Sequence, residues 1–177
     1  YSTPMAHALD AHCDLLLVGD SVAMVLYGMD TTQGADIDMM IRHGQAVMRR
    51  RQNALVIIDL PAGSYENSPQ QALASARRVL DETGADGVKL EGGSDIAGHV
   101  ALLVDSGIAV LAHIGLLPQH VSSKSGFRIT GRTTEEAAQL AADASALSQA
   151  GVFGVVMEGI IEPVAASIAA DCSVPTI

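Results

Sequence analysis

The 177 residues are 49% hydrophobic and 17% charged, and carry a formal net charge of −10 at pH 7. That apolar content excludes a disordered chain and is enough for one domain with a hydrophobic core. Asp and Glu outnumber Lys and Arg by 20 to 10, which argues against a nucleic-acid or anionic-membrane partner, because both need a basic surface. Two distant cysteines, Cys13 and Cys172, form no disulfide framework or zinc motif, and a reducing cytoplasm suits them.

Short apolar runs alternate with longer Ala-rich stretches along the chain. The runs predict five strands and the opening of a sixth, at 15–19, 55–59, 87–91, 108–113, 154–158 and 174–177. Because the runs are continuously apolar, they are typical of buried strands in a parallel sheet. No run approaches the ~20 residues of a membrane-spanning helix, so we expect a soluble chain.

Capping residues predict the helices between these strands. The expected helices are 36–51, 68–84, 94–107, 133–151 and one that opens at Pro163. Ser68 and Pro69 are a typical helix start and Gly84 a typical helix end, while Thr133 and Glu136 form a capping box. Ser94 is expected to cap its helix, and the arginines at 49–51 to complement the dipole of theirs.

The strand–helix units follow one another without a linker, which indicates a single α/β domain over residues 1–177. An open doubly wound sheet and a (β/α)8 TIM barrel both fit this pattern. Neither a G-x-G-x-x-G motif after the first strand nor a P-loop motif is present, which counts against the nucleotide-binding forms of the open sheet.

Chemically active side chains follow or close each of the five complete strands. They are Asp20, Ser21, Asp59, Lys89, Glu91, His113 and Glu158. Parallel strands end at one face, and barrel active sites are built there from several strand ends. Taken singly, Asp20 or Asp59 fits a helix cap or turn, and His113 a hydrogen-bonded core residue. Their occurrence at all five strand ends indicates a site.

Carboxylates without a Cys or His cluster are typical of Mg²⁺ rather than zinc. A 2-oxo acid is a natural substrate, because its oxygens chelate the metal and Lys89 can neutralise its carboxylate. The metal would stabilise the enolate formed when a carboxylate base removes a proton beside the ketone. Asp20 and Asp59 would hold the metal and Glu158 would be the base. No G-x-S-x-G elbow supports acyl transfer.

Several short motifs follow one another along the whole chain. They are LVGDS at 17–21, DLP at 59–61 with GSY at 63–65, VKLEGG at 88–93, HIGL at 113–116 with PQ at 118–119, GR at 131–132, and Glu158. In this order they resemble the 3-methyl-2-oxobutanoate (ketopantoate) hydroxymethyltransferase family.

The resemblance implies a (β/α)8 barrel that uses Mg²⁺ and 5,10-methylenetetrahydrofolate to convert 3-methyl-2-oxobutanoate into 2-dehydropantoate, in pantothenate biosynthesis. It also implies a large homo-oligomer, often a decamer. The implied site residues are the metal ligands Asp20, Asp59 and Glu91; the 2-oxo acid contacts Asp20, Ser21, Asp59 and Lys89; the proton acceptor Glu158; and a supporting His113.

A closed barrel typically takes about 250 residues. We therefore expect an incomplete barrel, truncated at both ends, that lacks the first strand and the C-terminal units. The chain departs from the family pattern in its loops, at Ala23, at 32–36 (TQGAD) and at 159–161 (GII).

Two other functions stay open. One is a related Mg²⁺-dependent 2-oxo acid lyase or mutase of the phosphoenolpyruvate mutase/isocitrate lyase type, although no Lys-Lys-Cys-Gly-His-like segment is present. The other is a non-catalytic homologue with an assembly role.

Overall fold

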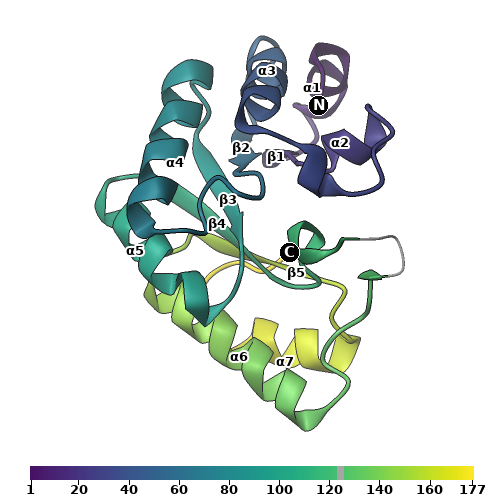
Figure 1. The fold of residues 1–177 in the computed structure, drawn as a ribbon, viewed down its shortest axis with the longest axis vertical. Helices are drawn as coiled ribbons and strands as arrows, with labels where there is room; N and C mark the ends of the chain where they lie inside the picture. Colours follow the sequence, from purple (N-terminus) through teal and green to yellow (C-terminus); the bar gives the residue numbers. More distant parts are fainter. Residues whose placement is uncertain (123–125) are drawn as a thin grey trace.

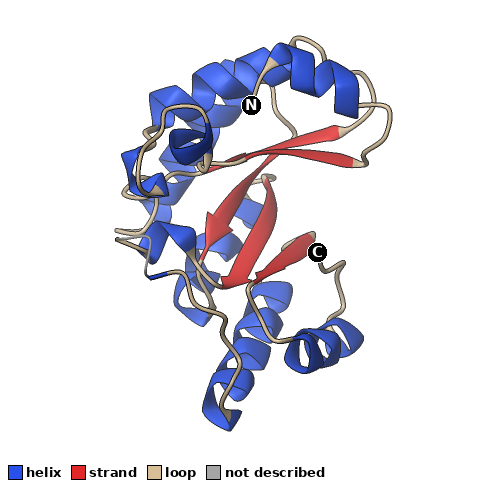
Figure 2. Cartoon of the chain, turned by 90° about the vertical axis from the view of Figure 1, so that its right-hand side faces the viewer, coloured by secondary structure: helices blue, strands red, loops and turns tan. Residues whose placement is uncertain are grey.

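Five parallel strands form one sheet in the described part of the chain, residues 1–122 and 126–177 of a computed structural model. Their order in the sheet is their order in the sequence: β1 (Leu15–Val18), β2 (Leu55–Asp59), β3 (Gly87–Glu91), β4 (Ala109–Gly115) and β5 (Gly154–Glu158). The sheet curls, and the helices lie outside the curl (Figure 1 and Figure 2). The result is an α/β half-barrel.

Helices lie in each connection between successive strands, as parallel neighbours require, and one further helix precedes β1 and another follows β5. They are α1 (Thr3–Leu9), α2 (Val22–Val25), α3 (Ile37–Met48), α4 (Pro69–Thr83), α5 (Ala97–Asp105), α6 (Thr134–Gln149) and α7 (Glu162–Asp171), with short 3₁₀ turns η1 (Thr32–Gly34), η2 (Ser94–Ile96) and η3 (Pro118–His120). None of the described helices is long and apolar enough to cross a membrane.

The capping signals of α4 are confirmed, and the capping box of α6 is confirmed in part, because the Glu136 side chain accepts the Arg132 N–H at 2.6 Å rather than that of Thr133. The Ser68 hydroxyl accepts the Gln71 N–H at 3.1 Å, and Gly84 ends α4 in the left-handed region with φ 73°. The Thr133 hydroxyl accepts the Glu136 N–H at 3.2 Å. Local sequence therefore decides where these two helices begin and where α4 ends.

Two predicted boundaries are wrong. The helix expected to reach residue 51 ends at Met48, and beyond it the Nη2 of Arg51 contacts both carboxylate oxygens of Asp86, which precedes β3. Ser94 caps no helix: it begins η2, and its N–H is donated to Asp143 of α6 at 2.8 Å. In both places a tertiary contact lies where the structure departs from the local signal.

The strands separate an apolar outer layer from a polar interior. In β3 every residue is buried, yet Val88 and Leu90 belong to the hydrophobic core while the alternate positions hold Lys89 and Glu91. Because side chains alternate along a strand, Lys89 and Glu91 share the face opposite to the core. The apolar side chains of β3 thus pack on the outer face of the sheet, and its charged side chains lie inside the curl.

Residues 174–177 extend the sheet beside β5. Val155 pairs with Thr176 in a parallel bridge, and the Ile177 N–H donates to the Val155 carbonyl at 3.0 Å. This confirms the expected opening of a further strand. In the described chain Ile177 is 67% exposed.

Candidate active site

The predicted strand-end residues converge inside the curl of the sheet. Five of the predicted residues are at most 4% exposed: Asp20, Asp59, Lys89, Glu91 and His113. Sheet register alone pairs Asp59 with Lys89 and Glu91 with His113 across neighbouring strands. The parallel arrangement therefore brings together charged residues that are as far apart as 93 positions in the chain.

Asp59 links the ends of three strands. Its Oδ1 accepts a hydrogen bond from Lys89 Nζ at 2.7 Å, and its Oδ2 accepts the backbone N–H of Asp20 at 2.9 Å. Both oxygens of this carboxylate are thus held by neighbours on β3 and after β1. The chain following β1 is thereby fixed against β2.

Lys89 is the cation at the centre of the site. Its Nζ lies 2.7 Å from Asp59 Oδ1 and 3.6 Å from Glu91 Oε1. Burial alone would lower the pKa of Lys89, but the charges of Asp59, Glu91 and Asp20 raise it above its ordinary value. Lys89 therefore keeps its proton.

Asp20 experiences the surplus of negative charge. Burial, followed by the charges of Asp59 and Glu91, raises the pKa of Asp20 to about 7, although Lys89 and Gln119 act in the opposite direction. Three buried carboxylates therefore face one ammonium. A divalent cation is the kind of ligand that would balance this charge.

His113 lies between two glutamates. Its Nδ1 is 3.3 Å from Glu91 Oε1, and its Nε2 is 3.6 Å from Glu158 Oε2. Burial alone would raise the pKa of Glu91, but the contact with His113, the charge of Lys89 and the backbone N–H of Gln119 bring it below its ordinary value. The side chain of Glu158 is 46% exposed, so this row leads from the buried carboxylates to the surface.

The position of Glu158 depends on a close approach between β4 and β5. Gly115 has φ 96°, and a Cβ built there would lie 2.2 Å from the carbonyl oxygen of Glu158. The same carbonyl accepts the Leu116 N–H at 2.8 Å. Strand β4 therefore runs to Gly115, two residues beyond the predicted end at His113.

Ser21 lies at the edge of the cluster. It is half-buried, and its Oγ is 2.5 Å from the hydroxyl of Tyr1. No hydrogen bond joins its side chain to the buried carboxylates within the described residues. The structure thus places all the predicted residues around one region, with five buried inside it and Ser21 and Glu158 at the rim.

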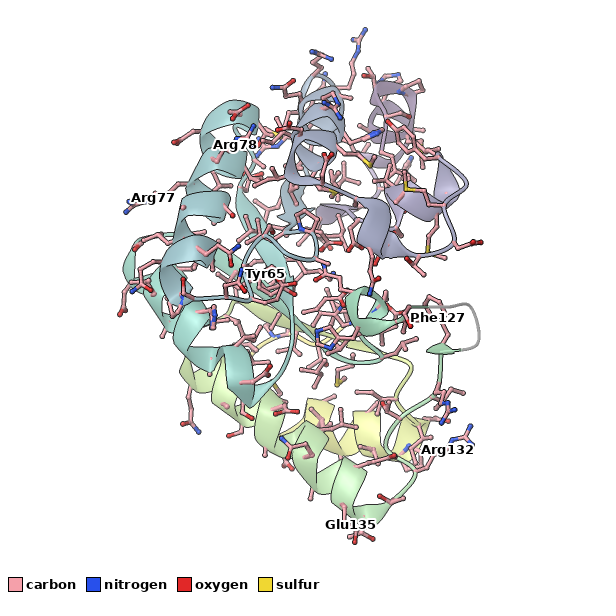
Figure 3. The ribbon with its side chains drawn as sticks, viewed as in Figure 1. Tyr65, Arg77, Arg78, Phe127, Arg132 and Glu135 are labelled. Carbon is pink, nitrogen blue, oxygen red and sulfur yellow. The ribbon has the colours of Figure 1, made fainter. Side chains whose placement is uncertain are left out.

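Two further residues, Tyr65 and Gln119, belong to the site although they carry no predicted role. Gln119 Nε2 donates to Asp20 Oδ2 at 2.9 Å, and the Gln119 backbone N–H donates to Glu91 Oε2 at 3.0 Å. Tyr65 is fully buried and its hydroxyl lies 2.7 Å from Gln119 Oε1. It lies within the molecule, whereas Arg77 and Arg78 are on the outer helix α4 (Figure 3). Tyr65 belongs to the motif GSY and Gln119 to the motif PQ, and this membership is the feature of the sequence that could have identified them as site residues.

The donor chemistry fits Mg²⁺. Within residues 1–122 and 126–177 no three His, Cys, Asp or Glu side chains already form a group that could hold a metal ion. Mg²⁺, however, is usually bound by one or two protein carboxylates and takes its other ligands from water and substrate. Asp20, Asp59 and Glu91 supply such oxygens, and burial together with the charges of Asp59 and Glu91 raises the pKa of Asp20.

Solved structures of similar fold include a lyase and a hydrolase. A 2,3-dimethylmalate lyase, described as a PEP mutase/isocitrate lyase superfamily member, matches with a TM-score of 0.69 and 19% identity over 99% of this chain and 62% of its own. A phosphonopyruvate hydrolase, solved as a complex with oxalate and Mg²⁺, matches with a TM-score of 0.71 and 10% identity over 99% of this chain and 63% of its own. These matches support the curled α/β sheet.

Sequence comparison is more specific. The 3-methyl-2-oxobutanoate hydroxymethyltransferase of Mesorhizobium japonicum is 58% identical over 177 residues, which are 100% of this chain and 62% of that protein. The chain spans between 62% and 65% of the length of such relatives. The family model described as ketopantoate hydroxymethyltransferase matches residues 1–177. The chain belongs to the ketopantoate hydroxymethyltransferase family.

Proposed function

We propose that the full-length protein transfers a hydroxymethyl group from 5,10-methylenetetrahydrofolate to 3-methyl-2-oxobutanoate, giving 2-dehydropantoate, and that it needs Mg²⁺. The observation that carries the proposal is the buried Lys89 surrounded by Asp20, Asp59 and Glu91, in a chain of this family. Such a group can bind an anionic substrate and a divalent cation side by side. The complete barrel is a (β/α)8 barrel in this proposal, of which the curled five-stranded sheet is a part.

Lys89 and Ser21 bind the carboxylate of the 2-oxo acid. Lys89 supplies a fixed positive charge, because Asp59 holds its ammonium at 2.7 Å, and Ser21 supplies a hydroxyl at the rim. Asp20 and Asp59 would also contact the 2-oxo acid. Asp20, Asp59 and Glu91 would hold Mg²⁺, which when bound acts as a Lewis acid toward the keto oxygen.

Glu158 is the proton acceptor. A general base must reach the proton it removes and later release it to solvent. The exposure of the Glu158 side chain, 46%, supports proton release to solvent, and its Oε2 lies 3.6 Å from His113 Nε2 at the edge of the buried cluster. In this assignment Glu158 takes the proton from C3 of the 2-oxo acid, and C3 then bonds to the methylene carbon of the folate. The two C–N bonds of that carbon break, one water molecule supplies the hydroxyl group, and tetrahydrofolate leaves. His113 supports the carboxylate in that position.

By family resemblance we also propose a cytoplasmic homo-oligomer, with the decamer as the expected form. The mass of the full-length protein in solution, measured by light scattering, tests this part separately. A stable monomer would contradict it.

The test of the reaction uses the full-length protein with Mg²⁺, 3-methyl-2-oxobutanoate and 5,10-methylenetetrahydrofolate, and detects 2-dehydropantoate by mass spectrometry. We expect product that disappears when EDTA removes the metal. A parallel reaction with a substituted malate tests the lyase alternative. Cleavage of that malate without hydroxymethyl transfer would favour the lyase, and neither reaction from a folded, Mg²⁺-loaded protein would favour the non-catalytic homologue.

A further inference from the structure

Gln119 donates hydrogen bonds to three groups inside the site, from its side chain and from its backbone. It lies in η3 after β4, and it is only 3% exposed. Its Nε2 donates to Asp20 Oδ2 and to the Leu60 carbonyl, each at 2.9 Å. One side-chain amide thus bridges the ends of β1 and β2.

Tyr65 fixes which way this amide points. Its hydroxyl lies 2.7 Å from Gln119 Oε1 and accepts the Glu91 N–H at 3.2 Å. The hydroxyl has a single proton, and Gln119 Oε1 is nearer than the Glu91 carbonyl at 2.9 Å. If the amide were flipped, Oε1 would face two acceptors, Asp20 Oδ2 and the Leu60 carbonyl. The observed orientation is therefore the one in which every polar atom of the amide has a partner.

The backbone of Gln119 holds a second carboxylate. Its N–H donates to Glu91 Oε2 at 3.0 Å, while Glu91 Oε1 faces Lys89 and His113. One oxygen of Asp20 and one oxygen of Glu91 are therefore occupied by the same residue. The second oxygen of Glu91, Oε1, lies in the interior of the site, 3.6 Å from Lys89 Nζ and 3.3 Å from His113 Nδ1.

We propose that Gln119 is a positioning residue that holds Asp20 and Glu91 so that one oxygen of each carboxylate stays available to metal or substrate, with Tyr65 setting the orientation of its amide. The proposal rests on the proposed Mg²⁺-dependent function and goes beyond the residues that the family resemblance assigns. Outer partners of ligating carboxylates typically change metal affinity 10–100-fold when they are removed. Gln119 is expected to act in this range.

The test compares Gln119→Met with Gln45→Met in the full-length protein. Gln45 also donates its amide to a backbone carbonyl, that of Glu82 at 3.0 Å, but it lies between α3 and α4 away from the site. We expect Gln119→Met to raise the Kd for Mg²⁺, measured by calorimetry, about 10–100-fold, and to lower kcat more than it raises KM. A crystal structure of this variant should show the Asp20 carboxylate displaced and Glu91 in place, because its backbone partner is kept. Gln45→Met should leave the Kd unchanged.

An unchanged Kd for Mg²⁺ together with an unmoved Asp20 in Gln119→Met would overturn the proposal. If the parent protein neither binds Mg²⁺ nor makes product, the proposed function fails, whereas the position of Asp20 in the variant structure still decides the role of Gln119. If Gln119→Met does not fold, Tyr65→Phe replaces it, since this change keeps both donors of the amide and removes only the hydroxyl that orients it. A parent-like Kd in Tyr65→Phe would then count against the proposed orientation.

Discussion

The ammonium of Lys89 lies 2.7 Å from Asp59 Oδ1, and both side chains are at most 5% exposed. Removing one partner of a buried ion pair leaves an uncompensated charge and typically costs about 3–5 kcal/mol. We therefore expect Lys89→Met to lower the free energy of unfolding by about 3 kcal/mol or more at pH 8, measured by urea denaturation. The variant should also lose binding of the 2-oxo acid.

Arg78→Met is the matched control for Lys89→Met. Arg78 also contacts two carboxylates, Asp38 at 2.5 Å and Glu82 at 2.8 Å, but its side chain is 46% exposed. Exposed pairs contribute little to stability, so this variant should unfold like the parent. Equal losses in the two variants would show that burial does not set the contribution of Lys89.

Asp20 gives the metal-free protein a defined pH dependence. Its pKa of about 7 in the folded state, raised by burial and by Asp59 and Glu91, lies above the ordinary value of about 3.9 for an unfolded chain. The folded state therefore keeps a proton that the unfolded state loses, and the stability linked to Asp20 is present below about pH 4 and is lost as the pH rises through 7. Asp20→Asn removes this linkage and keeps an acceptor for Gln119. We measure the free energy of unfolding in EDTA at pH 4.5, 6 and 8. The difference between variant and parent should grow in favour of the variant as the pH rises. Parallel pH profiles of the two proteins would contradict the assignment.

Mg²⁺ binding should be coupled to the same proton. If Asp20 is a ligand, it must be ionised, so binding releases a proton below pH 7. We expect the Kd for Mg²⁺ to rise by up to about tenfold for each pH unit below 7. Calorimetry in two buffers of different ionisation enthalpy measures the number of protons released. A Kd that is constant from pH 5.5 to 8 would exclude Asp20 as a ligand.

The sequence is sufficient to predict the polar interior. Lys89 and Glu91 stand two positions apart in an apolar strand, so the two-residue period of a strand puts them on one face. The parallel order of the strands then brings both side chains close to the other strand-end residues. Asp59 ends the preceding strand, so the parallel order also brings it to this face, whereas its pairing with Lys89 is set by the sheet register of the structure. These relations depend on strand geometry, which the local pattern encodes.

The roles of Gln119 and Tyr65 could not be predicted in this way. Both lie in the connections after strands. Tyr65 and Gln119 are 54 residues apart in the sequence, and Gln119 and Asp20 are 99 residues apart. No periodicity specifies how such loops fold over the strand ends. The ion pair between Arg51 and Asp86, beyond the end of α3, is likewise a tertiary contact.

Gly115 offers a steric test of the route from β4 to Glu158. Gly115→Ala would place a methyl group 2.2 Å from the Glu158 carbonyl oxygen, so the end of β5 must move. Gly107→Ala is the control, because Gly107 also has a positive φ, 81°, but has nothing within 4 Å of its added Cβ. Both variants bear the cost of a left-handed residue, about 1–2 kcal/mol. Only Gly115→Ala should also lose hydroxymethyl transfer, and equal activity in the two variants would show that this approach does not position Glu158.

Glu158→Gln tests the proposed base directly. The amide is nearly the same size but cannot take up the C3 proton, and general-base catalysis typically contributes 10²–10⁴-fold. We expect Mg²⁺-dependent deuterium exchange at C3 of 3-methyl-2-oxobutanoate, followed by NMR, to fall by about that factor. Because the side chain of Glu158 is 46% exposed, melting temperature and Mg²⁺ affinity should stay close to those of the parent. Glu162→Gln, the same change at an exposed residue in the first turn of α7, should exchange at the parental rate. Exchange that survives in Glu158→Gln would assign proton removal to another group.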